Sequence, residues 1–316
     1  MSYAQFGTIQ AADYNALVGA NPGGTANVLN TTWATGSGAA GYGQTAEANV
    51  AAGDTVTAAK WANLITKTSS LASHQSSSIT SVTAPASGNT ITYNANVVTN
   101  LQTTYVNRLN AVSQSGTSAN TATYAPTWLN AITFTHIVTF ANGDAARYFF
   151  NSGGQLAITC AHPAGTGINL LLNNLASNVG TVVLSSPTSG TATIASTSYN
   201  GVTKVGGGGS TPTISTNSGY YSWTTSNANA FYQTASTGPS GYLSTNINIL
   251  VKTNGTQGSN GDAGNVITIS TVWDEIPNGL TVATGSATTV TIRPPEVTYI
   301  ANTWGTPSVT GTVTGS

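Results

Sequence analysis

The side chains that could carry out acid–base or nucleophilic chemistry are few and widely spaced in this sequence. Its 316 residues include three histidines, eight carboxylates and one cysteine. None of the histidines, His74, His136 and His162, has an acidic residue close to it in sequence. A serine hydrolase needs a histidine oriented by a carboxylate, and no Gly-x-Ser-x-Gly motif is present to expose a nucleophile. We therefore predict a protein that is not an enzyme, with no catalytic, cofactor-binding or metal-binding residues and no cofactor.

The pair Asp274-Glu275 is the only place where two carboxylates are adjacent in the sequence. A glycosidase uses two carboxylates that flank the bond it cleaves, and the second one could come from Asp144, Asp262 or Glu296. The pair follows a tryptophan and comes shortly before a proline, which is typical of the end of a strand. We favour this structural interpretation, with a glycosidase pair as the alternative.

Three further segments have compositions that some binding sites share. Gly206–Ser210 lacks the Lys-Ser/Thr of a phosphate-binding loop and predicts a flexible loop or linker. Asn254–Asn265 has a single carboxylate, Asp262, where a calcium loop offers several, so we predict a long hairpin loop. The aromatic rings of Tyr220–Trp223 could stack on a sugar, but the core of a sandwich also needs aromatic residues, and we prefer that role.

The composition predicts a folded protein whose surface is polar but almost uncharged. Only 5% of the residues are charged, against about 25% in ordinary soluble domains, while 39% are hydrophobic, which is enough for a packed core. The formal net charge is −1 and the seven Lys and Arg residues are dispersed, so we predict no nucleic-acid partner. The single cysteine, Cys160, excludes an internal disulfide and a Cys-rich zinc site.

No segment has the pattern of an export signal or a membrane span. The first residues (MSYAQFG) have neither a basic region nor an apolar region, and no run approaches the ~18 consecutive apolar residues of a membrane-spanning helix. We therefore expect no secretory signal and no membrane insertion. An uncharged outer surface on a chain that stays in the cytoplasm is typical of a particle that assembles inside a cell and acts outside it.

The first part of the chain, residues 1–82, predicts a small helical head built on an internal repeat. Thr8–Val18 aligns without gaps with Thr55–Ile65, and each copy places an aromatic residue three positions before a leucine, on one helix face. We expect the two helices to pack through Tyr14 and Trp61. Chance similarity between alanine-rich helices is the alternative to a true duplication.

The helical pattern continues beyond this repeat. We expect Thr57 to cap the second helix, whose apolar face extends through Leu71, and a glycine-rich link, Gly36–Gly43, to separate the two copies. Residues 83–127 predict a linker with one amphipathic helix over Asn94–Ser113. Its apolar positions are spaced by three and four residues: Val98, Leu101, Tyr105, Leu109 and Val112. Such a helix needs a partner, which is either the head or copies of itself.

From Trp128 onward the apolar period changes from that of helices to that of strands. Ala131–Phe140 alternates, and because His136 falls on its apolar side we expect a buried core histidine. Similar alternation marks three further segments: Leu243–Thr253, Val266–Trp273 and Thr289–Arg293. We predict a mainly antiparallel β-sandwich over residues 128–296 and a C-terminal arm over 297–316, which gives an α+β fold for the whole chain.

Turn signals divide the strand-rich part. Asn-Gly pairs, which favour tight turns, occur at three places: Asn142-Gly143, Asn200-Gly201 and Asn254-Gly255. The clearest predicted hairpin is Tyr199–Thr203. One helix is expected to interrupt the strands around Ile168–Leu175.

One segment resembles a known family of proteins. Asp144–Leu156 (DAARYFFNSGGQL) is similar to a segment that recurs in virion structural proteins of tailed phages, notably cyanophages and T4-like relatives, where a short helix leads through Gly-Gly into a strand. Gly41–Gln44 (GYGQ), followed by a helix that starts at Ala58–Trp61 (AAKW), also resembles the N-terminal region of such proteins. The resemblance covers the head and Ile132–Leu156, and the remainder of the chain follows in composition and strand-rich style.

The resemblance implies a structural subunit of the virion, of the tail, neck or fibre type, that acts through assembly and without catalysis. The expected partners are copies of the same chain, as a homo-oligomer such as a trimer or hexamer, and other virion proteins. Two alternatives stay open: a carbohydrate-binding module of a phage fibre that contacts a host surface glycan, and a decoration protein of the capsid. From the residues themselves, Tyr148–Phe150 must be buried, and Arg147 is expected to pair with a carboxylate or with main-chain carbonyls.

Overall fold

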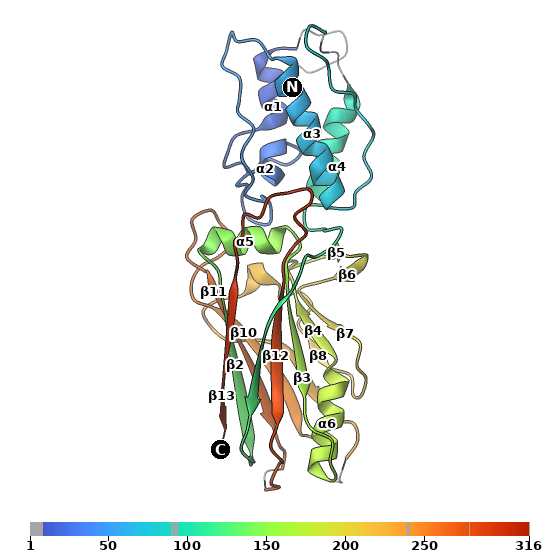
Figure 1. The fold of residues 1–316 in the computed structure, drawn as a ribbon, viewed down its shortest axis with the longest axis vertical. Coiled ribbons are helices and arrows are strands. Elements are labelled where there is room, and N and C mark those ends of the chain that lie inside the picture. The colour runs from blue at the N-terminus through green and yellow to red at the C-terminus, as the bar shows by residue number, and fades with distance from the viewer. Residues whose placement is uncertain (1–8, 90, 92–93, 239–240, 278, 316) are drawn as a thin grey trace.

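The computed structural model describes residues 9–89, 91, 94–238, 241–277 and 279–315. The chain forms an elongated molecule with a helical head at one end and a sheet-rich body below it (Figure 1). The predicted α+β class is confirmed, with a small N-terminal helical part and antiparallel sheets. We call the end of the body that faces the head the joint end, and the opposite end the distal end.

Within the described residues, the head consists of helices α1 (Ala11–Val18), α2 (Leu29–Trp33), α3 (Ala58–His74) and α4 (Ala95–Val106). Tyr14 of α1 and Trp61 of α3 are buried with their ring centroids 6.1 Å apart, as the repeat predicts. Thr57 caps α3 by accepting a hydrogen bond from a backbone N–H of the first turn, and the helix runs past Leu71 as expected. Thr8, at the start of the first repeat copy, lies outside the described residues.

Helix α4 differs from its prediction in length, orientation and place. It ends at Val106, well before Ser113, because the guanidinium of Arg108 donates to the carbonyl oxygens of Tyr105 (2.9 Å) and Ala39 (2.7 Å) and holds a turn there. Its buried side chains are Val97, Asn100, Leu101 and Thr104, a row rotated from the predicted one. The rotation follows from packing against α2 and α3 of the same chain, so α4 belongs to the head and not to a linker.

Two antiparallel sheets form the body. The first has the strand order β1 (Ser118–Tyr124), β12 (Ser286–Arg293), β3 (Gln155–Ala161), β4 (Thr181–Leu184) and β7 (Val202–Val205). The second has the order β13 (Ser308–Gly315), β2 (Ala131–Thr139), β11 (Val266–Asp274), β10 (Asn246–Thr253), β9 (Ala228–Thr234) and β8 (Thr213–Ile214). Helix α6 (Ile168–Val179), predicted around Ile168–Leu175, packs on β3, β9 and β10, and so contacts strands of both sheets.

The inward-facing side chains of both sheets share one core. Along β2, residues Ile132, Phe134, His136 and Val138 are buried in alternation, as predicted. Phe134 meets Trp273 of β11 edge to face, with ring centroids 5.9 Å apart. His136 is fully buried as expected, and this burial lowers its pKa below the ordinary histidine value.

The predicted hairpin at Tyr199–Thr203 is wrong. Strand β6 (Thr197–Tyr199) pairs with β5 (Ala192–Ile194) in a small separate sheet, whereas β7 pairs with β4, so Asn200-Gly201 connects two different sheets. The tight turn of this region is Ala195-Ser196, where both residues have positive φ. Asn142-Gly143 starts a helix, and Asn254-Gly255 lies in a hairpin loop between β10 and β11. Asn-Gly thus predicted bends of the chain but not which strands pair on either side of them.

The sandwich begins earlier and ends later than predicted. Strand β1 pairs with β12, and β13 pairs with β2 along its whole length, so the described residues after 297 are not a separate arm. The inward positions of β13 alternate valine with glycine, and this weak apolar contrast explains why only a strand-like arm, and not a strand of the sandwich, was predicted. Between β12 and β13, residues 294–307 rise to the head and return to the body (Figure 1). We call this segment the strap.

Candidate functional site

Helix α5 (Gly143–Asn151) lies between the head and the sheets (Figure 1). Asn142 starts this helix by accepting a hydrogen bond from the backbone N–H of Ala145 at 2.8 Å. Phe149 and Phe150 are fully buried as predicted, with ring centroids 5.1 Å apart, and both pack on Phe140. The apolar face of α5 thus enters the body, and its polar side chains are left for the head.

Arg147 holds the glycine-rich link of the head from within the protein. Its guanidinium is completely buried and donates to the carbonyl oxygens of Ala40 (2.9 Å) and Thr35 (2.8 Å). The same group forms an ion pair with Asp144, with 3.1 Å from Nη2 to Oδ1. The expectation that Arg147 pairs with a carboxylate or with carbonyls is therefore confirmed on both counts. A buried arginine with this many partners fixes both the position and the orientation of the link.

Asn151, one turn further along α5, completes the grip on the same link. Its amide nitrogen donates to the carbonyl oxygens of Gly38 (3.2 Å) and Gly41 (3.1 Å). The hydroxyl of Tyr221 lies between the two partners, 2.5 Å from Asn151 Oδ1 and 2.9 Å from the Gly38 carbonyl oxygen. Burial raises the pKa of Tyr221, which keeps its hydroxyl protonated as a donor. The link that separates the repeat copies is thus a fixed part of the joint.

Two glycines are required where the link meets α5. Gly41 has φ +99°, and a Cβ there would collide with the backbone of Thr35. Gly43 has φ +69°, and a Cβ there would lie 2.5 Å from the ring of Tyr148. Positive φ combined with this close approach restricts both positions to glycine. The two glycines of the GYGQ sequence therefore have a direct structural cause.

The strap closes the joint from the other side. Gln44 exchanges two hydrogen bonds with the backbone of Ala301, at 2.8 and 2.9 Å, and the hydroxyl of Thr303 donates to the carbonyl oxygen of Tyr42. Ile300 and Trp304 of the strap are buried. Head, body and strap thus meet around the same short stretch of the head, which gives the joint its rigidity.

Burial shifts the pKa values of Tyr42 and His74 at the joint. Burial raises the pKa of Tyr42, whose hydroxyl donates to the carbonyl oxygen of Arg108 at 2.6 Å. Burial lowers the pKa of His74 to about 4, although Nε2 of its ring lies 3.1 Å from the carbonyl oxygen of Ser152. Both side chains therefore stay uncharged near neutral pH.

At the distal end the side chains of Ser286 and His162 are in contact. This contact was not predicted from the sequence. His162 lies between Ser286 Oγ, 2.9 Å from Nδ1, and Asn169 Oδ1, 3.2 Å from Nε2. The arrangement looks like a catalytic triad, but Ser286 is fully buried and already accepts a hydrogen bond from the indole N–H of Trp128 at 3.1 Å. Asn169 also accepts from the backbone N–H of Ala283 at 2.8 Å. The network ties three loops to α6 and to the start of β12, and it leaves the serine oxygen inaccessible to a substrate.

Strand β11 separates carboxylates that the sequence suggested as a possible glycosidase pair. Asp274 ends this strand, as the strand-end interpretation predicts, whereas Asp262 precedes its start. A strand of this length keeps its ends roughly 26 Å apart, while the two carboxylates of a glycosidase lie within about 9.5 Å. Glu275 is fully buried and accepts hydrogen bonds from the backbone of Gly279 (3.2 Å) and Leu280 (2.9 Å). Glu296 of the strap accepts a hydrogen bond from the Ser113 hydroxyl at 3.3 Å, on the chain that connects α4 to β1.

The other singled-out segments have structural roles. Gly206–Ser210 is a packed loop rather than a flexible linker, because Gly208 bonds to Asn178 through its N–H and to Gln233 through its carbonyl. Asn254–Asn265 is the predicted hairpin loop between β10 and β11. The aromatic segment Tyr220–Trp223 includes two core residues, exposed by 0% and 3%, so they offer no face to a sugar.

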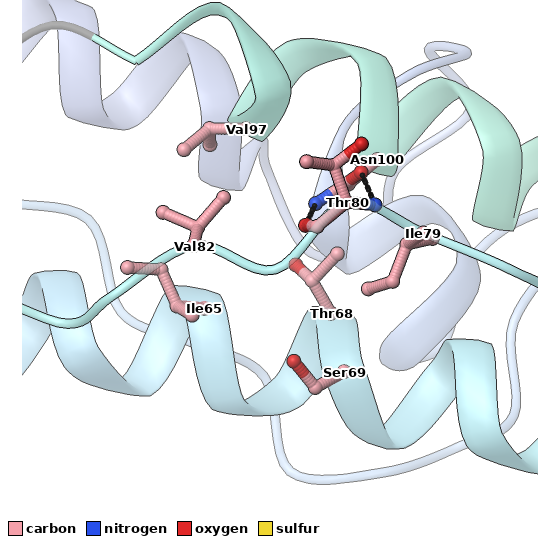
Figure 2. A pocket seen from close by; sticks show the side chains of 8 residues that line it. All are labelled: Ile65, Thr68, Ser69, Ile79, Thr80, Val82, Val97 and Asn100. Carbon is pink, nitrogen blue, oxygen red and sulfur yellow. Dashed lines mark hydrogen bonds between the residues drawn. The ribbon is translucent and has the colours of Figure 1, made fainter.

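A small pocket lies in the head between α3, α4 and the chain that connects them (Figure 2). It contains about 250 Å³ of space, its open mouth included, and has no charged residue among its lining side chains. Asn100 is engaged in two hydrogen bonds with the backbone of Thr80, at 2.7 and 3.1 Å, which Figure 2 draws as dashed lines. Ligand sites for drug-sized molecules start at about 300 Å³ and aim polar groups at the ligand. This pocket is smaller than that, and its lining amide, Asn100, is already engaged.

In the part of the chain that the structure describes, no group of three or more His, Cys, Asp and Glu residues is placed to hold a metal ion. Within the same residues, no helix has the length and hydropathy that crossing a membrane requires. At the joint, the side chains of Arg147, Asn151, Tyr221 and Gln44 all bond to main-chain groups that lie far from them in sequence. Comparisons with protein-family models, with curated proteins and with solved structures gave no match to this chain.

Proposed function

We propose that this protein is a structural subunit of a tailed-phage virion, of the tail, neck or fibre type, that works through assembly of identical copies and without catalysis. One observation supports the proposal above the others. In the segment that resembles virion proteins, Asp144–Leu156, the side chains of Arg147 and Asn151 donate hydrogen bonds that join the body to the head. A subunit that docks through one part and projects another needs such a fixed joint.

The surface chemistry supports the same role. A net charge of −1 on 316 residues means that copies of the chain repel one another very little when they are packed closely. The outward positions of β2 and β13 are mostly threonine, which can pack against a neighbour without the desolvation cost of burying charges. An uncharged sheet face of this kind is suited to repeated contacts in a symmetric assembly.

The carbohydrate-binding alternative is weakened, because Tyr220 and Trp223, the aromatic rings best suited to stack on a sugar, are buried in the core. The depolymerase form of that alternative would need two converging carboxylates, and the strand β11 separates Asp262 from Asp274. The capsid-decoration alternative requires neither exposed aromatic rings nor paired carboxylates. It differs from our proposal in the oligomeric state that it predicts for the isolated protein.

The test is the mass of the purified protein in solution, measured by light scattering over a range of concentrations. We expect a stable trimer or hexamer that persists on dilution. A monomer at every concentration would contradict assembly through identical copies and favour a decoration protein. A parallel assay for sugar release from bacterial surface polysaccharides should give none, and release would contradict the non-catalytic role.

A further inference from the structure

Strand β13 is attached to the body mainly through its backbone. It pairs with β2 over eight residues, from Ser308 opposite Thr139 to Gly315 opposite Ile132. None of its side chains is fully buried, and Val309 and Val313 are its only apolar residues packed on the core. By contrast, β12 buries Val290 and Ile292 between two neighbouring strands. The body therefore holds β13 by ladder hydrogen bonds, which any copy of β2 could supply equally well.

The chain before β13 passes from contacts with the head to purely local contacts. The strap is fixed to the head by Gln44, which bonds to Ala301, and by Thr303, which donates to the carbonyl oxygen of Tyr42. The next residue, Gly305, is exposed, and both its N–H and its carbonyl oxygen bond to the side chain of Asn302 within the strap. A change of backbone direction at Gly305 would break only these two local hydrogen bonds. We therefore place the point at which β13 could leave its own sheet, with the joint intact, at Gly305.

We propose that β13 is exchanged between copies of this chain in the assembled state, so that it pairs with β2 of a neighbouring molecule. The partner is a second copy because the place that receives the strand is built by this sequence. Gly311 faces inward where a Cβ would meet Asn120 of β1 and lie 3.0 Å from the ring of His136. A strand with glycine at this position enters without displacing these two side chains, and β13 has one.

Exchange of an edge strand links subunits at a small energetic cost, since the ladder that opens within one chain closes again between two chains. It would turn surface packing into an interlocked assembly that resists dissociation. The inference rests on the proposed assembly, because it needs neighbouring copies, and it adds the element through which they are linked.

The experiment uses full-length chains in a Cys160→Ser background, so that no native thiol reacts. One chain carries Thr135→Cys and the other, with a different tag, carries Thr312→Cys; these residues are direct partners in the β2–β13 register. Opposite residues in a sheet have Cα atoms about 4.5–5.5 Å apart, within the range that a disulfide spans. The two chains are unfolded, mixed, refolded together and oxidised. We expect a disulfide-linked pair that carries both tags.

A matched control separates strand pairing from random collision. Thr139→Cys mixed with Thr314→Cys places the two thiols at opposite ends of the same ladder, and should link far less. Adding Gly311→Val to the Thr312→Cys chain should abolish the link, because the valine cannot enter next to His136.

The mass of the same samples distinguishes the two proposals. A third sample is the double variant Thr135→Cys/Thr312→Cys, in which a disulfide can form inside one chain. If the protein is an oligomer, the double variant forms this internal disulfide, and chains with different tags are never linked, then strand exchange is overturned and the assembly role stays intact. A monomer without any link between tags would overturn both.

Discussion

The two ends of the body are held by different chemistry. At the joint end, a buried arginine, an amide and a tyrosine hydroxyl bind the carbonyl oxygens of a glycine-rich link. At the distal end, a network of neutral groups, centred on His162 and Ser286, ties loops of the same sandwich to one another. A charged donor with several partners gives a strong and directional attachment, which suits a contact between two separate parts. A neutral network is sufficient where the strands themselves already fix the loops.

The largest expected effect comes from removing the charge at the joint end. Arg147→Met leaves the carbonyl oxygens of Thr35 and Ala40 without their donor and Asp144 without its cation. We expect the free energy of unfolding to fall by about 3 kcal/mol, the low end of the range for breaking a buried ion pair from one side, because Asp144 is 25% exposed. The measurement is equilibrium urea unfolding followed by tryptophan fluorescence.

The matching change at the distal end is Ser286→Ala, which removes the acceptor for Trp128 and the partner of His162. Its expected cost is about 1–3 kcal/mol, typical of unsatisfied neutral groups. A cost for Ser286→Ala that equals or exceeds that of Arg147→Met would break the comparison between the two ends.

A second, smaller effect tests the close approach of the link to α5. Gly43→Ala introduces a Cβ at positive φ and against the ring of Tyr148, so we expect a loss of about 2–3 kcal/mol. Gly53→Ala is the control, because Gly53 also has positive φ but has open space around it. It should lose only about 1 kcal/mol. The two variants are compared by thermal unfolding. If both lose the same stability, the link is not in close contact with α5 at Gly43.

The pH dependence of stability tests the buried histidine of the joint. Burial lowers the pKa of His74 from 6.5 to about 4, so the unfolded chain takes up a proton at a higher pH than the folded chain. Stability is therefore full above the unfolded-state pKa and falls as the pH drops towards the folded-state pKa. Between pH 7 and pH 5 we expect a loss of about 2 kcal/mol from this group.

His74→Gln should remove most of this dependence, as seen in urea unfolding at the two pH values. His162→Gln is the comparison at the distal end, where burial also lowers the pKa and the side chain of Asn169 opposes the shift. An unchanged pH dependence in His74→Gln would mean that other groups account for the acid sensitivity.

The smallest expected effects come from the helix caps. Asn142→Ala removes the cap of α5 at the joint, and Thr57→Ala removes the cap of α3 in the head. Each should lower the free energy of unfolding by about 1 kcal/mol. Heat denaturation of the two variants, monitored by far-ultraviolet circular dichroism, would sharpen the comparison. If Asn142→Ala unfolds in two separate thermal transitions and Thr57→Ala unfolds in one, then weakening the joint has allowed head and body to unfold independently. This result would show that the joint couples them.

The sequence predicted best those elements whose burial is periodic. Strands β2, β10 and β11 alternate so regularly that their buried faces could be named, and the pair Tyr14 and Trp61 followed from helical spacing. Strand β13 was predicted only as a strand-like arm, because glycine occupies an inward position, Gly311, where an apolar side chain would have marked the buried face. The hairpin at Asn200-Gly201 was wrong because a turn residue specifies local φ and ψ and not the partner of the next strand.

The joint could be predicted only in part. The need of Arg147 for carbonyl or carboxylate partners followed from its rarity in an uncharged chain, but its partners Thr35 and Ala40 lie far away in sequence. The positive φ of Gly41 and Gly43 was visible only as a glycine-rich composition. The contact of Ser286 with His162 gave no local signal, since the two residues are 124 positions apart.

The pairing of β1 with β12 has a consequence for the order of events during synthesis. Thr121 and Thr289 face each other across these strands at a separation of 168 residues, and Gln44 meets Ala301 at a separation of 257. Contacts this distant in sequence form slowly, because a long loop must close before they can stabilise the fold. We expect the head helices to form while the ribosome is still translating the body, with β1 and β2 waiting unpaired for their partners. The nascent chain is therefore most exposed to aggregation just before its final strands emerge.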